Sequence, residues 1–90
     1  MLREFYYVYV LFDGRRFYIG YSGDLRQRIR KHKSGGVKST KNRKGLRLVF
    51  YEAYLSKEDA QRREKYLKTA KGKKALKLML RDSLKLCPVV

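Results

Sequence analysis

Residues 7–32 read YVYVLFDGRRFYIGYSGDLRQRIRKH, and they decide the fold because two apolar runs, a turn signal and a helix follow one another without a gap. The pair Asp13-Gly14 separates the two runs. Such a pair is the strongest short-range signal for a β-hairpin, since a type I′ turn needs positive φ at both central positions. We therefore expect strands over residues 5–12 and 17–21, joined by this turn.

The length of the hairpin loop decides how two tyrosines on these strands are placed. If Asp13-Gly14 is the whole loop, Tyr9 lies directly opposite Tyr18. A loop of four residues makes the pair diagonal but keeps both rings on one face of the sheet. A loop of three residues separates them, because a slip of one residue moves every side chain to the other face. In the two registers that we favour, both phenols lie side by side.

A basic amphipathic helix is expected directly after the second strand. Ser22 or Asp24 can cap it, because either side chain can accept a hydrogen bond from a free backbone N–H of the first turn. The face toward the sheet consists of Leu25, Ile29 and His32, with Arg28 at its edge. The outward residues are Arg26, Arg30, Lys31 and Lys33. Hairpin and helix should therefore bring two tyrosines, one arginine and one histidine to a common surface.

The composition indicates a polyanionic partner. The 90 residues contain 24 Lys and Arg against 8 Asp and Glu, a net charge of +16. Such charge destabilises a compact chain unless a polyanion binds it, so nucleic acid is the first candidate and an anionic membrane surface the second. No apolar run approaches the ~20 residues of a transmembrane helix, and no signal peptide, lipidation motif or long amphipathic basic helix supports a membrane role. The single cysteine, Cys87, excludes an intramolecular disulfide and predicts a cytoplasmic location.

The rest of the chain completes one α+β domain. The expected segments are a mobile basic loop over residues 34–45, a third strand over 46–54, and helices over 56–69 and 73–86. Gly72 is expected to end the first of these helices as a left-handed cap. The buried stripe of the last helix is expected to comprise Leu76, Met79, Leu80 and Leu84. We expect a small three-stranded, mainly antiparallel sheet flanked by three helices, in the order β-β-α-β-α-α. Residues 1–86 form the domain and residues 87–90 a C-terminal tail.

Glu64 is the acidic residue whose position asks for an explanation. It falls in the inward stripe of the helix over 56–69, between Ala60 and Leu67. A carboxylate there is costly unless it is paired or binds a metal. Lys68, four residues later, offers an ion pair in the favoured orientation. Spacing alone leaves the metal ligand and the ion pair equally open.

Two short motifs, Tyr7-Val8-Tyr9 and Tyr18-Ile19-Gly20, together resemble the paired motif of the GIY-YIG nucleases. The second motif is intact, whereas the first keeps only its final tyrosine. Arg28 stands ten residues after Tyr18, where the family has an arginine, and His32 matches a histidine of some members. The resemblance covers nearly the whole chain. It is closest to small stand-alone members and more distant from the nuclease domain of the excinuclease C subunit.

This resemblance implies a fold with a small mixed sheet and a metal-dependent phosphodiester hydrolase. It implies that both tyrosines belong to the site and that Glu64 holds Mg²⁺, with Mn²⁺ as a substitute. We favour Tyr9 as the base, with its pKa lowered by Arg28, the metal and the positive field, and Tyr18 as the residue that positions phosphate or water. Arg28 would clamp the phosphate through its planar fork of donors. His32 either orients the phosphate, relays a proton or is structural.

Basic residues around the helix and the following loop are the candidate nucleic-acid contacts, since each neutralised phosphate releases a counterion. They are Arg26, Lys31, Lys38, Lys41, Arg43 and Lys44. The alternative is a solvated loop whose charge only aids solubility. One departure from the family is notable: an asparagine often follows the metal glutamate, but Asn42, before it, is the only asparagine here.

We therefore expect a metal-dependent endonuclease that hydrolyses phosphodiester bonds in DNA, in repair or processing, with little sequence specificity. Two alternatives remain open: a non-catalytic nucleic-acid-binding module with the same basic surface, and a basic structural protein docked on ribosomal RNA. Glu64 discriminates between them, because binding alone needs no inward carboxylate. The sequence leaves DNA against RNA, the nucleic-acid structure that is cut, and the oligomeric state undecided.

Overall fold

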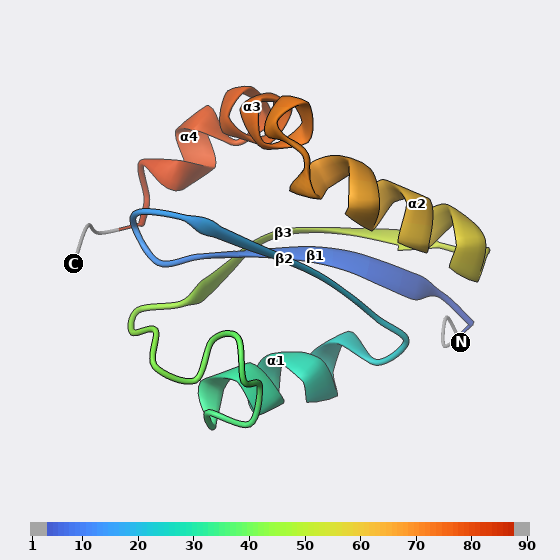
Figure 1. The fold of residues 1–90 in the computed structure, drawn as a ribbon, viewed down its shortest axis with the longest axis horizontal. Coiled ribbons are helices and arrows are strands. Elements are labelled where there is room, and N and C mark those ends of the chain that lie inside the picture. The colour runs from blue at the N-terminus through green and yellow to red at the C-terminus, as the bar shows by residue number, and fades with distance from the viewer. Residues whose placement is uncertain (1–3, 88–90) are drawn as a thin grey trace.

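Alternating apolar residues form a three-stranded antiparallel sheet in this computed structural model, which describes residues 4–87. The strands are β1 (Tyr6–Phe12), β2 (Phe17–Ser22) and β3 (Arg47–Tyr54), in the order β2-β1-β3. Both faces of the central strand β1 are apolar or aromatic, and helices cover both faces of the sheet (Figure 1). The expected α+β class and the order β-β-α-β-α-α are confirmed, with a fourth, short helix at the end.

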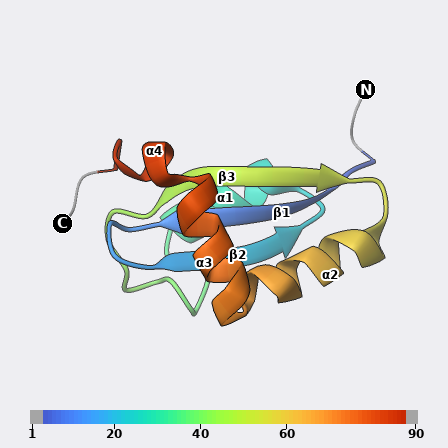
Figure 2. The same ribbon diagram turned by 90° about the horizontal axis from the view of Figure 1, so that it is seen from above.

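The helices lie in two layers. Below the sheet in Figure 1 lie α1 (Leu25–Lys33) and the segment that leads to β3. Above it lie α2 (Lys57–Lys68), α3 (Ala70–Met79) and α4 (Arg81–Leu84). Seen from above, α2 runs along the β2 side of the sheet and α3 crosses over the strands (Figure 2). Within residues 4–87, none of these helices has the length and apolar character needed to cross a bilayer.

The main core lies between the sheet and the upper helices. Its buried members are Val8, Val10, Ile19, Ala60, Leu67, Leu76 and Leu80. Arg63 of α2 and Glu52 of β3 tie these layers together by two parallel hydrogen bonds, 2.9 and 3.1 Å long. Tyr54 donates a third bond to the same carboxylate, at 2.7 Å. The even-numbered residues of β1 thus build the core, which leaves the odd-numbered face for α1.

The hairpin loop has four residues, so the expectation of a two-residue type I′ turn is wrong. Phe12 pairs with Phe17, and residues 13–16 form the loop. Among the non-glycine residues described, none has positive φ, so Asp13 does not adopt the conformation that a type I′ turn requires. Its carboxylate instead accepts hydrogen bonds from the backbone N–H groups of Arg15 and Arg16, both 3.0 Å long. Such local bonds offer the chain an alternative to the tight turn.

The helix ends partly follow the expected caps. Asp24, rather than Ser22, caps α1 and accepts from the N–H of Gln27 at 3.1 Å. The expected cap of α2 is confirmed, because Ser56 accepts from the N–H of Asp59.

The junction between α2 and α3 differs from the expectation. Gly72 is not a left-handed cap but lies in the first turn of α3, and Thr69 separates the helices and caps α3. A Cβ at Gly72 would meet Leu67 Cα at 2.6 Å, so glycine is needed for the close contact between the two helices. Met79 is 50% exposed and does not join the buried stripe; it is the last residue of α3, and α4 begins at Arg81.

The segment over 34–45 is anchored, in contrast to the expected mobile loop. Val37 and Thr40 are buried beneath the sheet. Arg43 reaches back to Asp13 in the hairpin loop through an ion pair of 2.9 Å, with both side chains only 12% exposed. At the C-terminus, Cys87 is buried, whereas residues 88–90 of the expected tail lie outside the described residues.

Candidate functional site

The site is built around Tyr9, which lies between the sheet and α1. In the observed register Tyr9 pairs with Gly20, and Tyr18 is its diagonal neighbour on the same face. A Cβ at Gly20 would fall well inside contact distance of the Cζ and Oη atoms of Tyr9. The glycine of the Tyr18-Ile19-Gly20 motif therefore makes room for the phenol ring. The expected side-by-side arrangement is confirmed by a distance of 6.3 Å between the centroids of the two tyrosine rings.

A chain of hydrogen bonds runs through this phenol. Arg28 Nε donates to Tyr9 Oη at 3.3 Å, and Tyr9 Oη lies 2.8 Å from His32 Nε2. On its other side, His32 Nδ1 lies 2.8 Å from Thr40 Oγ1. Tyr9, His32 and Thr40 are each at most 5% exposed. Helix α1 and the anchored loop therefore hold four side chains in one connected and largely buried network.

The direction of each bond follows from the donors at the two ends. Thr40 Oγ1 donates to the carbonyl of Val37 at 3.4 Å, so its oxygen accepts from His32 Nδ1–H. His32 Nε2 then carries no proton and accepts from the phenol of Tyr9. Burial and the charge of Arg28 lower the pKa of His32, which keeps the ring neutral near pH 7. His32 thus stays neutral and holds the Tyr9 hydroxyl in place as a hydrogen-bond acceptor.

The Tyr9 pKa is raised to about 12, where the sequence predicted a lowered value. Burial is the largest cause, and the nearby Tyr18 and Glu64 add to it. The hydrogen bond and the charge of Arg28 act in the opposite direction but do not outweigh burial. Desolvation penalises the charged form of any buried acid, which explains why a strongly basic chain still holds this phenol neutral.

The network residues Arg28, Tyr9, His32 and Thr40, together with Tyr18, form what we call the Tyr9 cluster. Tyr18 and Arg28 lie on its more open side. The Tyr18 ring lies edge-on to the imidazole of His32, with centroids 4.9 Å apart. Both Tyr18 and Arg28 are half-buried, unlike Tyr9. Hydrogen bonding to Tyr9 raises the pKa of Arg28 further, and Tyr18 contributes in the same direction. A guanidinium with five donors, of which Nε is used by Tyr9, keeps others free for an anion.

Glu64 lies on α2, on the other side of the sheet from α1 (Figure 1). Its carboxylate is 20% exposed and pairs with Lys68 at 3.0 Å, so the ion pair expected from the spacing is present. Its negative charge is also the smallest of the causes that raise the pKa of Tyr9. Among residues 4–87, no group of three or more His, Cys, Asp and Glu side chains could hold a metal ion. One carboxylate fits Mg²⁺ when water and a substrate phosphate supply the remaining oxygens, because this ion keeps several waters.

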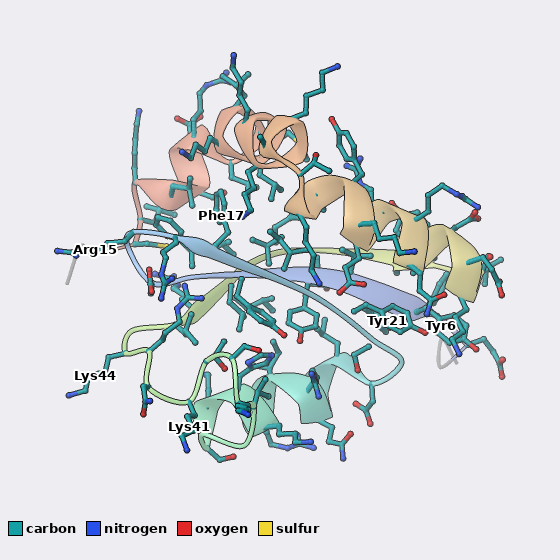
Figure 3. The ribbon with its side chains drawn as sticks, viewed as in Figure 1. Tyr6, Arg15, Phe17, Tyr21, Lys41 and Lys44 are labelled. Carbon is teal, nitrogen blue, oxygen red and sulfur yellow. The ribbon has the colours of Figure 1, made fainter. Side chains whose placement is uncertain are left out.

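Most of the candidate nucleic-acid contacts are exposed at the surface. The exposed ones are Arg26, Lys31, Lys38, Lys41 and Lys44. Figure 3 shows Lys41 and Lys44 pointing outward from the loop below the sheet. Arg43 differs, because its guanidinium binds Asp13 and the carbonyl of Arg16. It stabilises the hairpin loop and offers little to a ligand.

Thr40 is the site residue that sequence reasoning missed. It fixes the proton of His32, yet it lies in a Lys-rich segment without hydrophobic period. The one signal was Val37, an isolated apolar residue in that segment, which is buried at 7% exposure and places Thr40 one turn later beneath His32.

Comparisons with known proteins identify the family. A sequence model of the GIY-YIG catalytic domain matches residues 5–77. A UPF0213 protein from Staphylococcus saprophyticus is 39% identical over 80 residues, covering 88% of this chain and 96% of that protein. One from Clostridium perfringens is 36% identical over 81 residues, covering 88% and 87%. The solution NMR structure of a UPF0213 protein from Bacillus halodurans has a TM-score of 0.55 and 33% identity, covering 96% of this chain and 99% of that one.

The family match covers the strands and helices that carry Tyr9, Tyr18, Arg28, His32 and Glu64. These are the positions at which the resemblance to the GIY-YIG nucleases placed functional residues. The names of these similar proteins state no substrate and no metal, so the comparisons establish the family alone. The chain belongs to the GIY-YIG family and carries its catalytic domain, which indicates a nuclease acting on nucleic acid.

Proposed function

We propose that the protein is a metal-dependent endonuclease that hydrolyses phosphodiester bonds in DNA with little sequence specificity, in DNA repair or processing. One observation carries the proposal: the hydrogen-bonded chain from Arg28 through Tyr9 and His32 to Thr40, with Tyr18 beside it. A basic protein that only binds nucleic acid has no need for such a network. We assign residues 1–86 to the nuclease domain, residues 87–90 to a tail, and the protein to the cytoplasm.

Arg28 binds the scissile phosphate in this proposal. Its Nε is engaged by Tyr9, and the remaining N–H donors can bond two phosphate oxygens at once. The charge that develops on these oxygens in the transition state is stabilised by donors that are already in position. The bond to Tyr9 fixes the guanidinium before the substrate arrives, which lowers the entropy lost on binding.

Tyr18 is the phenol that meets the attacking water, which reverses the preference drawn from the sequence. Tyr9 is 0% exposed and holds its proton up to a pKa of about 12, whereas Tyr18 is half-buried. A base must reach the proton that it takes. Tyr9 then has a positioning role, because its hydroxyl accepts from Arg28 and donates to His32. Comparing the pH dependence of single-turnover cleavage for Tyr9→Phe and Tyr18→Phe tests this assignment.

Glu64 is the residue that would hold Mg²⁺, or Mn²⁺ in its place. When bound, such an ion would neutralise charge on the phosphate and on the leaving oxygen. Without an ion, Lys68 neutralises the Glu64 carboxylate. The Lys68 side chain is 53% exposed, so it can move aside at small cost in free energy. The surface residues Arg26, Lys31, Lys38, Lys41 and Lys44 would follow the phosphate backbone, which gives affinity without reading sequence.

The test is cleavage of end-labelled single-stranded, duplex and branched DNA and of RNA, with Mg²⁺ or Mn²⁺ against EDTA. The parent is assayed beside Arg28→Ala and Glu64→Ala. We expect metal-dependent cutting that is lost in both variants. Tight, salt-sensitive binding with no cutting of any substrate would refute the proposal.

A second candidate, a non-catalytic nucleic-acid-binding module, is favoured by one observation. Glu64 already has a cationic partner in Lys68, and a paired carboxylate explains its inward position without a metal. If this candidate is right, Glu64→Ala leaves binding unchanged and the parent cuts nothing.

A further inference from the structure

A groove lies on the α1 side of the sheet, outside the Tyr9 cluster. Its volume is about 800 Å³. Tyr7, Leu48 and Tyr51 of the sheet line it, together with Leu25 and Ile29 of α1. Tyr51 is 54% exposed, unusual for an aromatic residue on a sheet face that a helix accompanies. The groove therefore offers a large aromatic surface that the described part of the chain leaves open.

Helix α1 separates this groove from the Tyr9 cluster. At 100° per residue, Arg28 and Ile29 point to opposite flanks of the face that α1 turns to the sheet. Arg28 faces Tyr9 and β2, whereas Ile29 lines the groove toward β3. In the sheet, Tyr51 pairs directly with Tyr9 across the two strands. The groove is thus a distinct surface, one strand away from the phenol of the Tyr9 cluster.

The rim of the groove carries an ordered row of positive charge. Arg26, Arg30 and Lys33 line it at the spacing i, i+4 and i+7, and all three are exposed. A helix rises by 1.5 Å per residue, so the row spans about 10 Å along α1. The acidic residue of the lining is Asp24, whose carboxylate accepts from the N–H of Gln27 at the helix cap. The net character of the rim is strongly cationic.

The floor of the groove suits the face of a planar ring. Tyr7 and Tyr51 meet edge to face, with ring centroids 6.1 Å apart. This contact orients the Tyr51 ring while leaving more than half of its residue surface to solvent. A flat aromatic surface beside a row of cations matches a nucleotide, with a base on the ring and phosphates on the row. In a duplex the base faces are stacked and hidden, so the occupant is an unpaired base.

We infer that this groove binds a single-stranded segment of nucleic acid, with an unpaired base stacked on Tyr51 and its flanking phosphates on Arg26, Arg30 and Lys33. The inference rests on the proposed function in that it places nucleic acid on the α1 side of the sheet. It adds a binding site separate from the Tyr9 cluster, on the other flank of α1. Substrates with an unpaired stretch next to the cut site gain affinity from it.

The experiment uses the absence of tryptophan from the sequence. The variant Tyr51→Trp introduces a single indole, whose fluorescence is quenched when a base stacks on it. The variant Tyr66→Trp is the matched control, because Tyr66 is similarly exposed, at 41%, but lies on α2 over the opposite face of the sheet. Each is titrated in EDTA with an oligothymidylate of about eight nucleotides and with an abasic phosphate chain of the same length. Fluorescence anisotropy of the labelled oligonucleotides measures total binding in parallel.

We expect the oligothymidylate to quench Tyr51→Trp and not Tyr66→Trp, and the abasic chain to bind without quenching. In the parent background, Tyr51→Ala should weaken oligothymidylate binding by about 5- to 100-fold and leave abasic-chain binding unchanged, while Tyr51→Phe keeps the affinity. Far-UV circular dichroism confirms that the variants fold.

Binding without quenching of the Tyr51→Trp variant, or equal quenching of both variants, overturns the inference. A concentration-dependent spectral shift of the Tyr51→Trp variant without nucleic acid also overturns it, since a second copy of the chain would then occupy the groove. These readouts need no cleavage. If the parent cuts no substrate but the oligothymidylate quenches Tyr51→Trp, the proposed function is refuted and the groove assignment stands. If the parent cuts but Tyr51→Trp is not quenched, the groove assignment is refuted and the proposed function stands.

Discussion

Replacing Gly20 by alanine should displace the phenol at the centre of the site. The new Cβ falls inside contact distance of Tyr9 Cζ and Oη and lies 2.8 Å from Cε1. The strand backbone fixes the Cβ and the core packs β2 from the other side, so the Tyr9 ring has to move. Its hydrogen bonds to His32 and Arg28 depend on the present position and should be lost or lengthened.

The expected loss of stability follows from two contributions. Overpacking of a buried site costs about 1–3 kcal/mol, and the loss of a net hydrogen bond adds about 1 kcal/mol. Gly20→Ala should therefore lower the free energy of unfolding by about 2–4 kcal/mol, a fall in Tm of roughly 10–25 °C for a domain of this size.

Urea unfolding of a double-mutant cycle tests the cause. Leucine at position 9 lacks the ring atoms that the Cβ meets, so Gly20→Ala should cost less than about 1 kcal/mol in a Tyr9→Leu background. Gly23→Ala is the control, because a Cβ there touches only the Tyr6 ring, at 4.0 Å. An equal cost of Gly20→Ala in both backgrounds would refute the steric explanation.

Three further predictions concern titration and charge. Hydrogen bonds from the hairpin backbone and from Arg43 overcome burial and lower the Asp13 pKa to about 2 from 3.8, so Asp13 stabilises the fold above pH 4 and this stability is lost as pH falls toward 2. Asp13→Asn should remove about 2 kcal/mol of that acid dependence in urea unfolding. Burial raises the Tyr9 pKa to about 12 from 10.0, so the unfolded chain loses this proton first and stability falls between pH 10 and 12. Tyr9→Phe should remove about 2–3 kcal/mol of that fall. An unchanged alkaline stability profile would contradict the assignment. Arg28→Lys should slow cleavage about 100-fold because lysine lacks the planar fork, whereas Arg62→Lys, at an exposed position on α2, should cut at the parent rate.

The sheet and the shared face of Tyr9 and Tyr18 could be predicted from the sequence, because they depend on parity. Side chains alternate along a strand, so loops of two or four residues place the two phenols on one face. The loop length itself could not be predicted. It depends on the carboxylate of Asp13, which two local N–H groups and the distant Arg43 hold in place.

The loop after α1 escaped prediction for a related reason. Its order comes from tertiary contacts of Val37 and Thr40, and a polar sequence without period contains no sign of them. Gly72 was misread because the sequence does not distinguish a glycine needed for backbone conformation from one needed for close helix packing. The raised pKa of Tyr9 was missed because net charge is a property of the whole chain, whereas burial acts at one atom.

The exposure of Tyr51 could not be predicted from the sequence either. Alternation places Tyr51 on the face of Tyr9 but does not reveal that α1 covers one and leaves the other open. The relevant fact is the position of a nine-residue helix over a three-stranded sheet.

The most direct test of the account is cleavage by Glu64→Ala, measured beside the parent and beside Glu58→Ala, an exposed carboxylate on the same helix. With Mg²⁺ present, we predict that Glu64→Ala loses cleavage by at least about 100-fold while its affinity for uncut DNA is unchanged or slightly higher, since a negative charge has been removed. Glu58→Ala should cut at the parent rate. If Glu64→Ala cuts as fast as the parent, this carboxylate does not serve the reaction, and the ion pair with Lys68 is its whole role.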